Sequence, residues 1–590
     1  MKPIHFLSAC LLAASAFNPC FANADKAPEQ DLLLTMKLPS CGQIDRTVRD
    51  IESEWINRRP ILSTMWSLLT ATKESYFLPE KPFYLSVCTR ENENGKTTEN
   101  VHPLHPVSFL AGLPLTQMAV DRFTATIPMQ SDDGVQSVTI DDCFCSNVDT
   151  NLFGKTSFQL FFKQEGDYVW ITDAKKNLRP EIRNATRSAC SDPSALLAYS
   201  VNLSASRKAL TDDLVFDFLK ALSRLNHGAN EDGDEDEDAV PISDEELRNN
   251  INELKKHSLF WTMNPDDLGV SRSELFLDTK EGIVARNTIE FPDQSSPAVF
   301  LDELMARKSS VAFDKIPANT LFFLFEDGCL QDFFSRFLPQ PSLADFDPAL
   351  SPVFSKEEIL EFKQKIEPAF ERIKTSTKSN TRFFCTESRQ EGLAVFGNSD
   401  VSAEIADDQL TILKSVFALM EKGLQGFAKI DETPDKLTIF FPGEDFFQPL
   451  IKGTPGLTIG KTAGSVYFHA GNIEQPVVSP DLTDTALSIE PILQKYAPGA
   501  KVSLHSGLNL CKTVQLAAAI QQGETASAQF GKLKPAEATL TVLLEKNRLR
   551  SLLYLPGSFL SDFSKTILPD IPEDVVTGEE AAFDVPFDEE

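Results

Sequence analysis

The sequence predicts an α+β fold of two halves, each with a mainly antiparallel sheet and packed amphipathic helices. Short apolar stretches around turn residues, as at 157–172, are typical of strands joined in a β-hairpin. Apolar residues at helical spacing, such as Ile44, Val48 and Ile51, indicate helices that pack one face on a core. An acidic run at 230–238 divides the chain, because no packed core can hold that density of charge.

These features predict five segments along the 590 residues. The acidic run ends before Ser243-Asp-Glu-Glu246, which is a capping box that opens a new helix. After residue 568 the chain is acidic and has neither lysine nor arginine. The predicted segments are a signal peptide at 1–24, an N-terminal α+β half at 25–227, an acidic linker at 228–243, a C-terminal α+β half at 244–568, for which a division into two subdomains stays open, and a disordered acidic tail at 569–590.

The first residues are typical of a secretory signal peptide. Residues 6–17 are apolar or small, and Ala22-Asn-Ala24 has the small residues of a cleavage site. We therefore expect cleavage after Ala24 and a periplasmic or secreted protein. No later stretch has the ~18 uninterrupted apolar residues of a membrane-spanning helix, so the sequence predicts no membrane span.

The charge of the chain limits its partners. Lysine and arginine number 56 against 86 aspartates and glutamates, which gives a formal net charge of -30. Such a surface repels nucleic acid and anionic lipid, so we expect neither as a partner. An unknown envelope or other protein partner, and weak association with divalent cations, remain open.

Two short patterns recur along the chain and suggest an internal duplication. An apolar strand, a break and a cysteine before an amphipathic helix occur at 32–41 and again at 321–329. A turn with the sequence Gln-Glu-Gly occurs at 164–166 and at 390–392. The order of the patterns agrees but their spacing differs, so chance similarity is the alternative.

Over most of the mature chain, the strands that end at a proline before a helix and the alternating blocks of strand and helix resemble exported bacterial proteins of unknown function built from duplicated α+β units. The resemblance involves no specific motif and no catalytic residue. It implies the architecture and leaves the activity open.

Cysteine usage predicts disulfides. Eight of the ten cysteines follow the signal peptide, and an even number in an exported chain is typical of disulfide pairing. If the duplication holds, Cys41 and Cys329 are equivalent and have equivalent partners. The candidate pairs are then Cys41 with Cys88 and Cys329 with Cys385, with free thiols as the alternative.

The candidate ligand-binding motifs are incomplete. An EF-type calcium loop centred on Gly233 would use Asn230, Asp232 and Asp234, but carboxylates are missing at its first and twelfth positions. The glycines of 456–462 are separated by three residues where a phosphate loop has four, so a turn between strands is the better interpretation. We therefore expect no cofactor and no dedicated metal site.

The sequence also lacks the motifs of common hydrolases. Two histidines, His102 and His105, lie close together, but the prolines that follow them prevent a helix that would direct both at one metal. Acidic pairs such as Glu326-Asp327 and 345–347 arise easily by chance in so acidic a chain. The sequence therefore favours a non-catalytic binding or scaffolding protein of the cell envelope. The alternatives are a carboxylate-dependent secreted hydrolase and a cation-dependent surface protein.

Overall fold

A computed structural model of the chain describes residues between 32 and 567. The described residues are 32–56, 62–64, 76–89, 107–120, 138–140, 143–150, 156–189, 192–209, 216, 243–256, 258–308, 315–339, 342–346, 353–376, 380–388, 392–423, 429–441, 450–474, 481–485, 488–522 and 524–567. The predicted signal peptide, the acidic run at 230–238 and the predicted tail at 569–590 lie outside them.

The fold is built on one antiparallel sheet, in which 20 strands are described. This confirms the predicted α+β class with a mainly antiparallel sheet. In spatial order the strands are β4 (Val138–Ile140), β5 (Cys143–Thr150), β6 (Thr156–Glu165), β7 (Tyr168–Thr172), β3 (Val107–Pro114), β2 (Phe83–Thr89), β1 (Leu32–Leu38), β8 (Leu197–Asn202), β9 (Val270–Asp278), β10 (Gly282–Glu290), β22 (Arg548–Pro556), β21 (Glu537–Glu545), β20 (Lys501–Asn509), β12 (Thr320–Glu326), β13 (Thr381–Ser388), β14 (Gly392–Asp400), β18 (Ser465–Asn472), β17 (Pro455–Lys461), β16 (Lys436–Phe440) and β15 (Lys429–Thr433). A separate two-stranded ribbon consists of β11 (Lys315–Ile316) and β19 (Asp484–Thr485).

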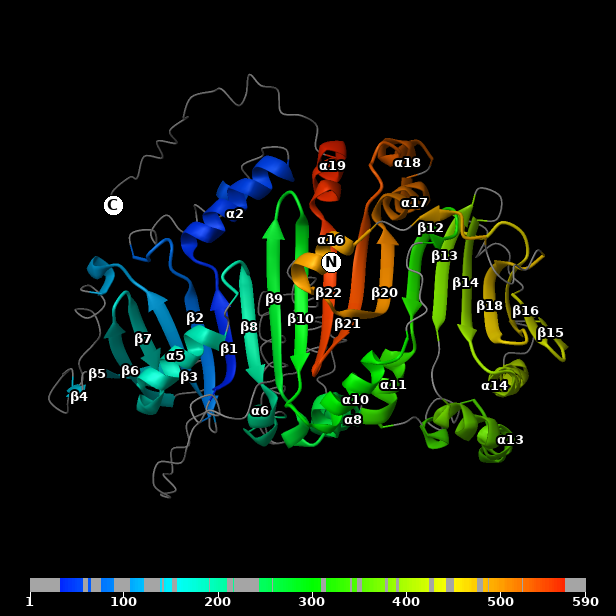
Figure 1. The fold of residues 1–590 in the computed structure, drawn as a ribbon, viewed down its shortest axis with the longest axis horizontal. Coiled ribbons are helices and arrows are strands. Elements are labelled where there is room, and N and C mark those ends of the chain that lie inside the picture. The colour runs from blue at the N-terminus through cyan, green and yellow to red at the C-terminus, as the bar shows by residue number, and fades with distance from the viewer. Residues whose placement is uncertain are drawn as a thin grey trace.

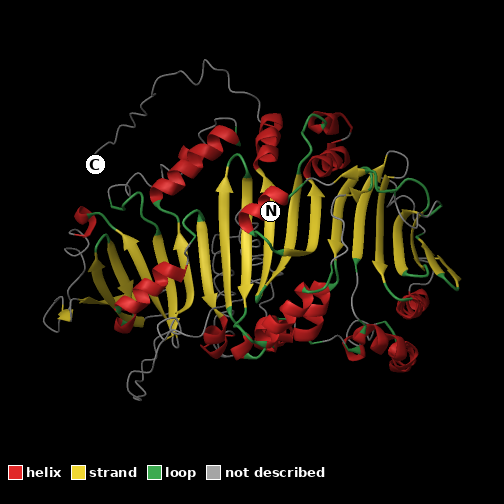
Figure 2. Ribbon diagram, viewed as in Figure 1, coloured by secondary structure: helices red, strands yellow, loops and turns green. Residues whose placement is uncertain are grey.

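The helices lie mainly along the two long edges of the sheet, where the strands end (Figures 1 and 2). One edge carries α2 (Cys41–Glu54), α17 (Leu510–Gln522), α18 (Glu524–Phe530) and α19 (Gly557–Ile567). The other carries α6 (Leu203–Ala209), α8 (Asp244–Lys256), α10 (Ser296–Met305), α11 (Cys329–Phe337), α13 (Lys356–Thr375) and α14 (Ala403–Gly423). Two helices, α5 (Pro180–Ala189) and α16 (Glu490–Tyr496), lie in front of the strands in Figure 1. The remaining short elements are α9 (Leu259–Thr262), η2 (Lys175–Leu178), η3 (Pro265–Asp267) and η4 (Leu343–Phe346).

Local sequence signals explain where several elements begin and end. Ser355 and Glu358 form a capping box at the start of α13, in which each side chain bonds the backbone of the other residue. The hydroxyl of Ser243 accepts from the backbone N–H of Glu246 and starts α8 as expected. The turn of the predicted hairpin at 157–172 has Gly166 at a φ of 57°, a conformation that favours glycine.

The same strand order occurs twice in the sheet. One set runs β1-β2-β3-β7-β6-β5 and continues on its other side through β8, β9 and β10. The second set runs β12-β13-β14-β18-β17-β16 and continues through β20, β21 and β22. The two sets meet where β10 pairs with β22, from Gly282 opposite Pro556 to Glu290 opposite Arg548. The boundary between the repeated orders therefore falls after residue 290.

The expectation that the acidic segment separates two independent interiors is wrong. Strands β8 and β9 flank residues 228–243 in the chain, yet they pair directly, with Leu197 opposite Leu275. Ala198 and Phe276, from opposite sides of the segment, share one buried cluster. The charge of the segment predicts that it is solvated, but it carries no information about the pairing of the strands on either side. The domain limits at 227 and 244 stay a prediction, which limited proteolysis tests.

The two sequence patterns behind the suggested duplication have different positions in the fold. Residues 32–41 and 321–329 are equivalent, because β1–α2 and β12–α11 take the same place in the two strand orders. The Gln-Glu-Gly turns are not equivalent. The first connects β6 with β7, whereas the second connects β13 with β14.

Candidate functional site

Six central strands, β8, β9, β10, β22, β21 and β20, have two faces of opposite character. Because residues that face each other across an antiparallel pair lie on the same side, the register assigns every residue to a face. We call one side the apolar face; it bears Leu197, Tyr199, Val201, Ser271, Ser273, Leu275, Leu277, Ile283, Ala285, Asn287, Ile289, Leu549, Ser551, Leu553, Leu555, Ala538, Leu540, Val542, Leu544, Leu504, Ser506 and Leu508. None of these residues is charged.

One charged residue, Lys501, extends toward the edge of the apolar face beyond the irregular register of β20. Its ammonium group donates to the carbonyl oxygens of Leu304 and Arg307, both at 2.9 Å, and lies 3.3 Å from a carboxylate oxygen of Asp327. The charge of Lys501 is therefore taken up by the end of α10 and by Asp327, and the middle of the face stays without charge.

The apolar face is covered at one edge and open in the middle. Leu544 and Leu549 are 0% and 7% exposed, because they share a core with residues of α10 and α11 such as Leu301 and Phe333. Further along the same strands, Leu540 and Leu553 face each other and are 41% and 51% exposed. Large aliphatic side chains at this exposure lie at an open surface.

A row of mostly apolar residues runs across the sheet through the exposed Leu540 and Leu553. We call it the aliphatic row, and it consists of Leu197, Leu275, Ala285, Leu553, Leu540, Ser506, Leu324 and Phe383. At ~4.8 Å between neighbouring strands, eight strands give the row a length of about 34 Å. The hydroxyl of Ser506, the one polar side chain in the row, donates to the carbonyl oxygen of Leu540 at 3.3 Å.

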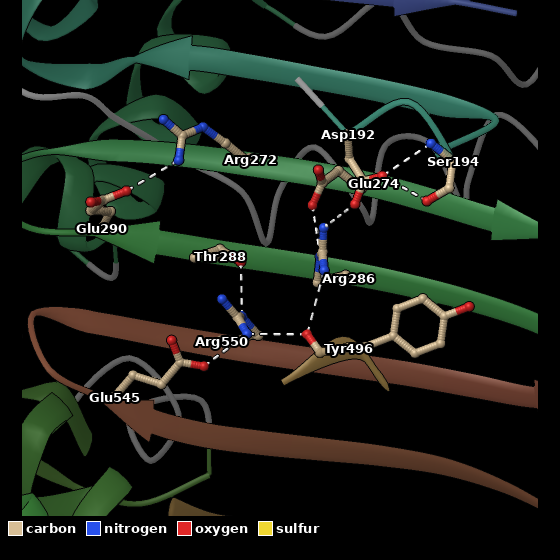
Figure 3. Close-up of polar contacts among 10 residues, drawn as sticks. All are labelled: Asp192, Ser194, Arg272, Glu274, Arg286, Thr288, Glu290, Tyr496, Glu545 and Arg550. Carbon is tan, nitrogen blue, oxygen red and sulfur yellow. Dashed lines mark hydrogen bonds and ion pairs between the residues drawn. The ribbon is translucent and has the colours of Figure 1, made fainter. Parts of the chain in front are cut away.

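The opposite side, which we call the polar face, holds a network of charged residues (Figure 3). Arg286 donates to Glu274 at 2.7 Å, to Asp192 at 2.9 Å and to the carbonyl oxygen of Tyr496 at 3.4 Å. Burial disfavours its charge, but the two carboxylates outweigh this effect and raise the pKa of Arg286. The guanidinium also lies 4.9 Å from the ring centre of Phe276.

Arg550 provides the second half of this network. It donates to the same Tyr496 carbonyl at 3.1 Å and to the Thr288 hydroxyl at 3.3 Å, and it lies 2.8 Å from a carboxylate oxygen of Glu545. Burial lowers the pKa of Arg550, and Glu545 opposes this effect. Arg286 and Arg550 therefore connect the two repeated strand orders through one carbonyl group of α16.

Helix α16 closes the polar face over this network. Its residue Tyr496 and the following Ala497 pack with Val284, Leu543 and Leu552 in one buried cluster. The carbonyl groups at a helix C-terminus carry partial negative charge, which suits the two guanidinium groups. Because these charged groups bond one another, we interpret the network as structural: it holds β10, β22 and α16 together.

The acidic pair Glu326-Asp327 is also engaged in structure. One carboxylate oxygen of Asp327 accepts from the backbone N–H of Cys329 at 3.0 Å and from the Ser503 hydroxyl at 2.7 Å. Glu326 accepts from the Gln331 amide at 2.6 Å, and burial raises the pKa of Glu326. Both carboxyl groups hold neighbouring side chains or backbone, so this pair does not favour the hydrolase alternative.

The predicted disulfides are wrong. Cys41 begins α2 beyond the Leu38 end of β1, whereas Cys88 lies opposite Leu32 at the other end of that strand. Cys329 likewise begins α11 beyond the Glu326 end of β12, whereas Cys385 lies opposite Phe322. Antiparallel pairing thus separates each predicted pair along a strand, and cysteines with Cα atoms more than ~7 Å apart cannot be bridged. No disulfide joins any two of Cys41, Cys88, Cys329, Cys385 and Cys511.

The thiol of Cys329 lies 3.5 Å from the Lys501 ammonium group, which is an arrangement that can activate a cysteine. Burial nevertheless raises the pKa of Cys329 to about 11, and the neighbouring Asp327 acts in the same direction. The thiol is therefore protonated at neutral pH, and this site is not suited to nucleophilic catalysis.

Most of the other sequence candidates lie in parts of the chain that the structure does not describe. Asn230, Asp232 and Asp234, with His102 and His105, lie outside the described residues. Residues 456–461 belong to β17, so they form neither a phosphate loop nor the turn that was expected. Within the described ranges, no group of three or more histidines, cysteines, aspartates or glutamates could hold a metal ion.

In the part of the chain that the structure describes, no helix is both long and apolar enough to cross a membrane. Comparison with protein-family models, curated proteins and solved structures gives no match. The proposal for function therefore depends on the geometry of this chain alone.

The apolar face was not among the features predicted from the sequence, although the sequence carries a signal for it. In β9 the charged residues Arg272, Glu274 and Asp278 all occupy even positions, and in β10 Arg286 and Glu290 do so as well. Charges confined to one parity of a strand indicate one charged and one apolar face.

Proposed function

We propose that the chain is an exported, non-catalytic binding protein of the cell envelope, and that the open middle of the apolar face is its binding surface. The observation that carries this proposal is the exposure of Leu540 and Leu553 in the middle of the apolar face, where the facing side chains of the six central strands are uncharged. Contiguous exposed apolar patches on soluble proteins mark interaction sites. The charged groups of the polar face are engaged with one another beneath α16, which supports a binding role over catalysis.

The accessibility of this surface can be tested with bis-ANS, a dye that fluoresces on apolar surfaces. We expect the native mature protein to bind the dye, and the double variant Leu540→Asp/Leu553→Asp to bind it at least tenfold more weakly. A matched control is Leu360→Asp on α13, because Leu360 is 57% exposed and lies outside the central strands. Equal dye binding by all three folded proteins would reject the apolar face as the binding surface.

Export is tested separately. We expect the protein in the periplasmic or culture fraction, with a mature N-terminus at Asp25. Recovery of the uncleaved chain in the cytoplasm would contradict the envelope location, without bearing on the binding surface.

We also propose that the two repeated strand orders arose by duplication of one unit. The equivalent places of β1–α2 and β12–α11 support this proposal, as does the junction of the two sets at β10 and β22. Two separately expressed chains that meet after residue 290 should then associate through this strand pair. Failure of the two fragments to fold and associate would argue against two separate units that meet at this strand pair.

A further inference from the structure

We propose that the occupant of the apolar face is the hydrocarbon chain of a fatty acid or lipid. This inference rests on the proposed function and specifies its ligand. The open middle of the face offers aliphatic side chains and no charge, and the polar group of Ser506 is already bonded within the sheet. A ligand there is held by apolar contact, which a hydrocarbon chain provides without any polar group that has to be satisfied.

The pairing of the strands excludes one common mode of peptide binding. Each of the six central strands has a neighbour on both sides, since β8 also pairs with β1 and β20 also pairs with β12. Their backbone groups are therefore used within the sheet, and these six strands present no edge to which a peptide could add a strand. The ligand has to lie across the face.

The shape of the open surface favours a narrow occupant. Along a strand it extends from Ser551 to Leu555, which is about 14 Å at ~3.4 Å per residue. With the ~34 Å of the aliphatic row, this outlines at most roughly 500 Å², and the buried Ser506 within it makes the open area smaller still. Stable protein interfaces bury roughly 800 Å² on each partner, so this area is too small for a stable dimer.

A second copy of the chain is also disfavoured by sterics and charge. Helices α10 and α11 stand on the apolar face where they cover Leu544 and Leu549. A helix is about 10 Å across, which is the spacing of two stacked sheets, so a flat sheet from another copy would collide with these helices. Two copies would in addition each carry a net charge of -30.

The test uses the mature chain, residues 25–590, and cis-parinaric acid, a fatty acid that fluoresces when its chain enters an apolar site. We expect saturable binding by the wild type, and binding weakened at least tenfold in Leu540→Glu/Leu553→Glu. Leu360→Glu should bind like the wild type. Circular dichroism and urea unfolding verify that the variants are folded. Competition by oleate and by phosphatidylcholine vesicles then distinguishes a free fatty acid from a lipid chain.

The outcomes separate this inference from the proposed function. If bis-ANS binding depends on Leu540 and Leu553 but cis-parinaric acid does not bind, the apolar surface stands and the hydrocarbon ligand is rejected. If neither probe depends on these residues, both proposals fail. If light scattering shows a dimer that the double variant abolishes, and the fatty acid does not bind, the face is an interface between copies and the inference is overturned.

Discussion

The two faces of the central strands differ in a way that reverses the usual rule. The polar face carries Arg286, Arg550 and their carboxylate partners, yet it is closed by α16. The apolar face carries aliphatic side chains, yet Leu540 and Leu553 are exposed. An ordinary two-layer protein would bury the aliphatic face and leave the charged face in water.

The comparison of the two faces shows that the burial of a side chain depends on the partners available to it. Arg286 and Arg550 can be buried on the polar face because each has partners there. These partners are Glu274, Asp192, Glu545 and the Tyr496 carbonyl. The open part of the apolar face has no such partner within the described residues, and an external ligand is the simplest cover. Four predictions test this difference, in order of decreasing effect.

The largest effect is expected on the polar face. Arg286→Ala leaves the side chains of Glu274 and Asp192, 10% and 27% exposed, without their guanidinium partner. We expect a loss of about 3 kcal/mol in the free energy of unfolding, measured in urea. The control is Arg272→Ala, which should cost about 0.5 kcal/mol because the Arg272 side chain, beside Glu290, is 41% exposed. Equal losses in the free energy of unfolding would mean that the Arg286 network does not act as a buried structural network.

Two leucines on β21 compare the faces directly. Leu543 is 1% exposed on the polar face, and Leu540 is 41% exposed on the apolar face. Leu543→Ala should lower the free energy of unfolding by about 3 kcal/mol, because it leaves a cavity beneath α16. Leu540→Ala should cost less than about 1 kcal/mol. The reverse order would show that the apolar face is the true core.

The pH dependence of stability should come from a residue of the polar face. Burial lowers the pKa of His505 from 6.5 to about 4, and its Nδ1 lies 3.1 Å from the Thr541 hydroxyl. The unfolded chain therefore binds a proton more readily, and stability falls as the pH decreases from about 6.5 towards about 4. Between pH 7.5 and 5.5 the wild type should lose about 1.4 kcal/mol that His505→Asn does not lose. Parallel pH profiles would refute this assignment.

The smallest effect concerns the cysteines. Because Cys41 and Cys88, like Cys329 and Cys385, lie at different ends of paired strands, neither pair should appear as a cross-linked peptide under non-reducing conditions. A reductant should change the unfolding of Cys385→Ser and of the wild type equally. Detection of either cross-link by mass spectrometry would contradict the described sheet register.

Local signals in the sequence were sufficient for many elements. The capping box at Ser355 and the glycine turn at Gly166 each depend on residues close in the chain, and both are present in the structure. The candidate sites were predicted less well than these elements. The predicted disulfide pairs required knowledge of which ends of β1 and β12 approach β2 and β13, and antiparallel register decides this from distant residues.

By itself, the sequence determined the α+β class, the helix starts and the confinement of charge to one parity of strands such as β9 and β10. Only the tertiary structure decided that β8 pairs with β9 across the acidic segment, and that β10 meets β22. The reason is that capping and periodicity act within a few residues, whereas strand pairing and the covering of a face depend on segments hundreds of residues apart.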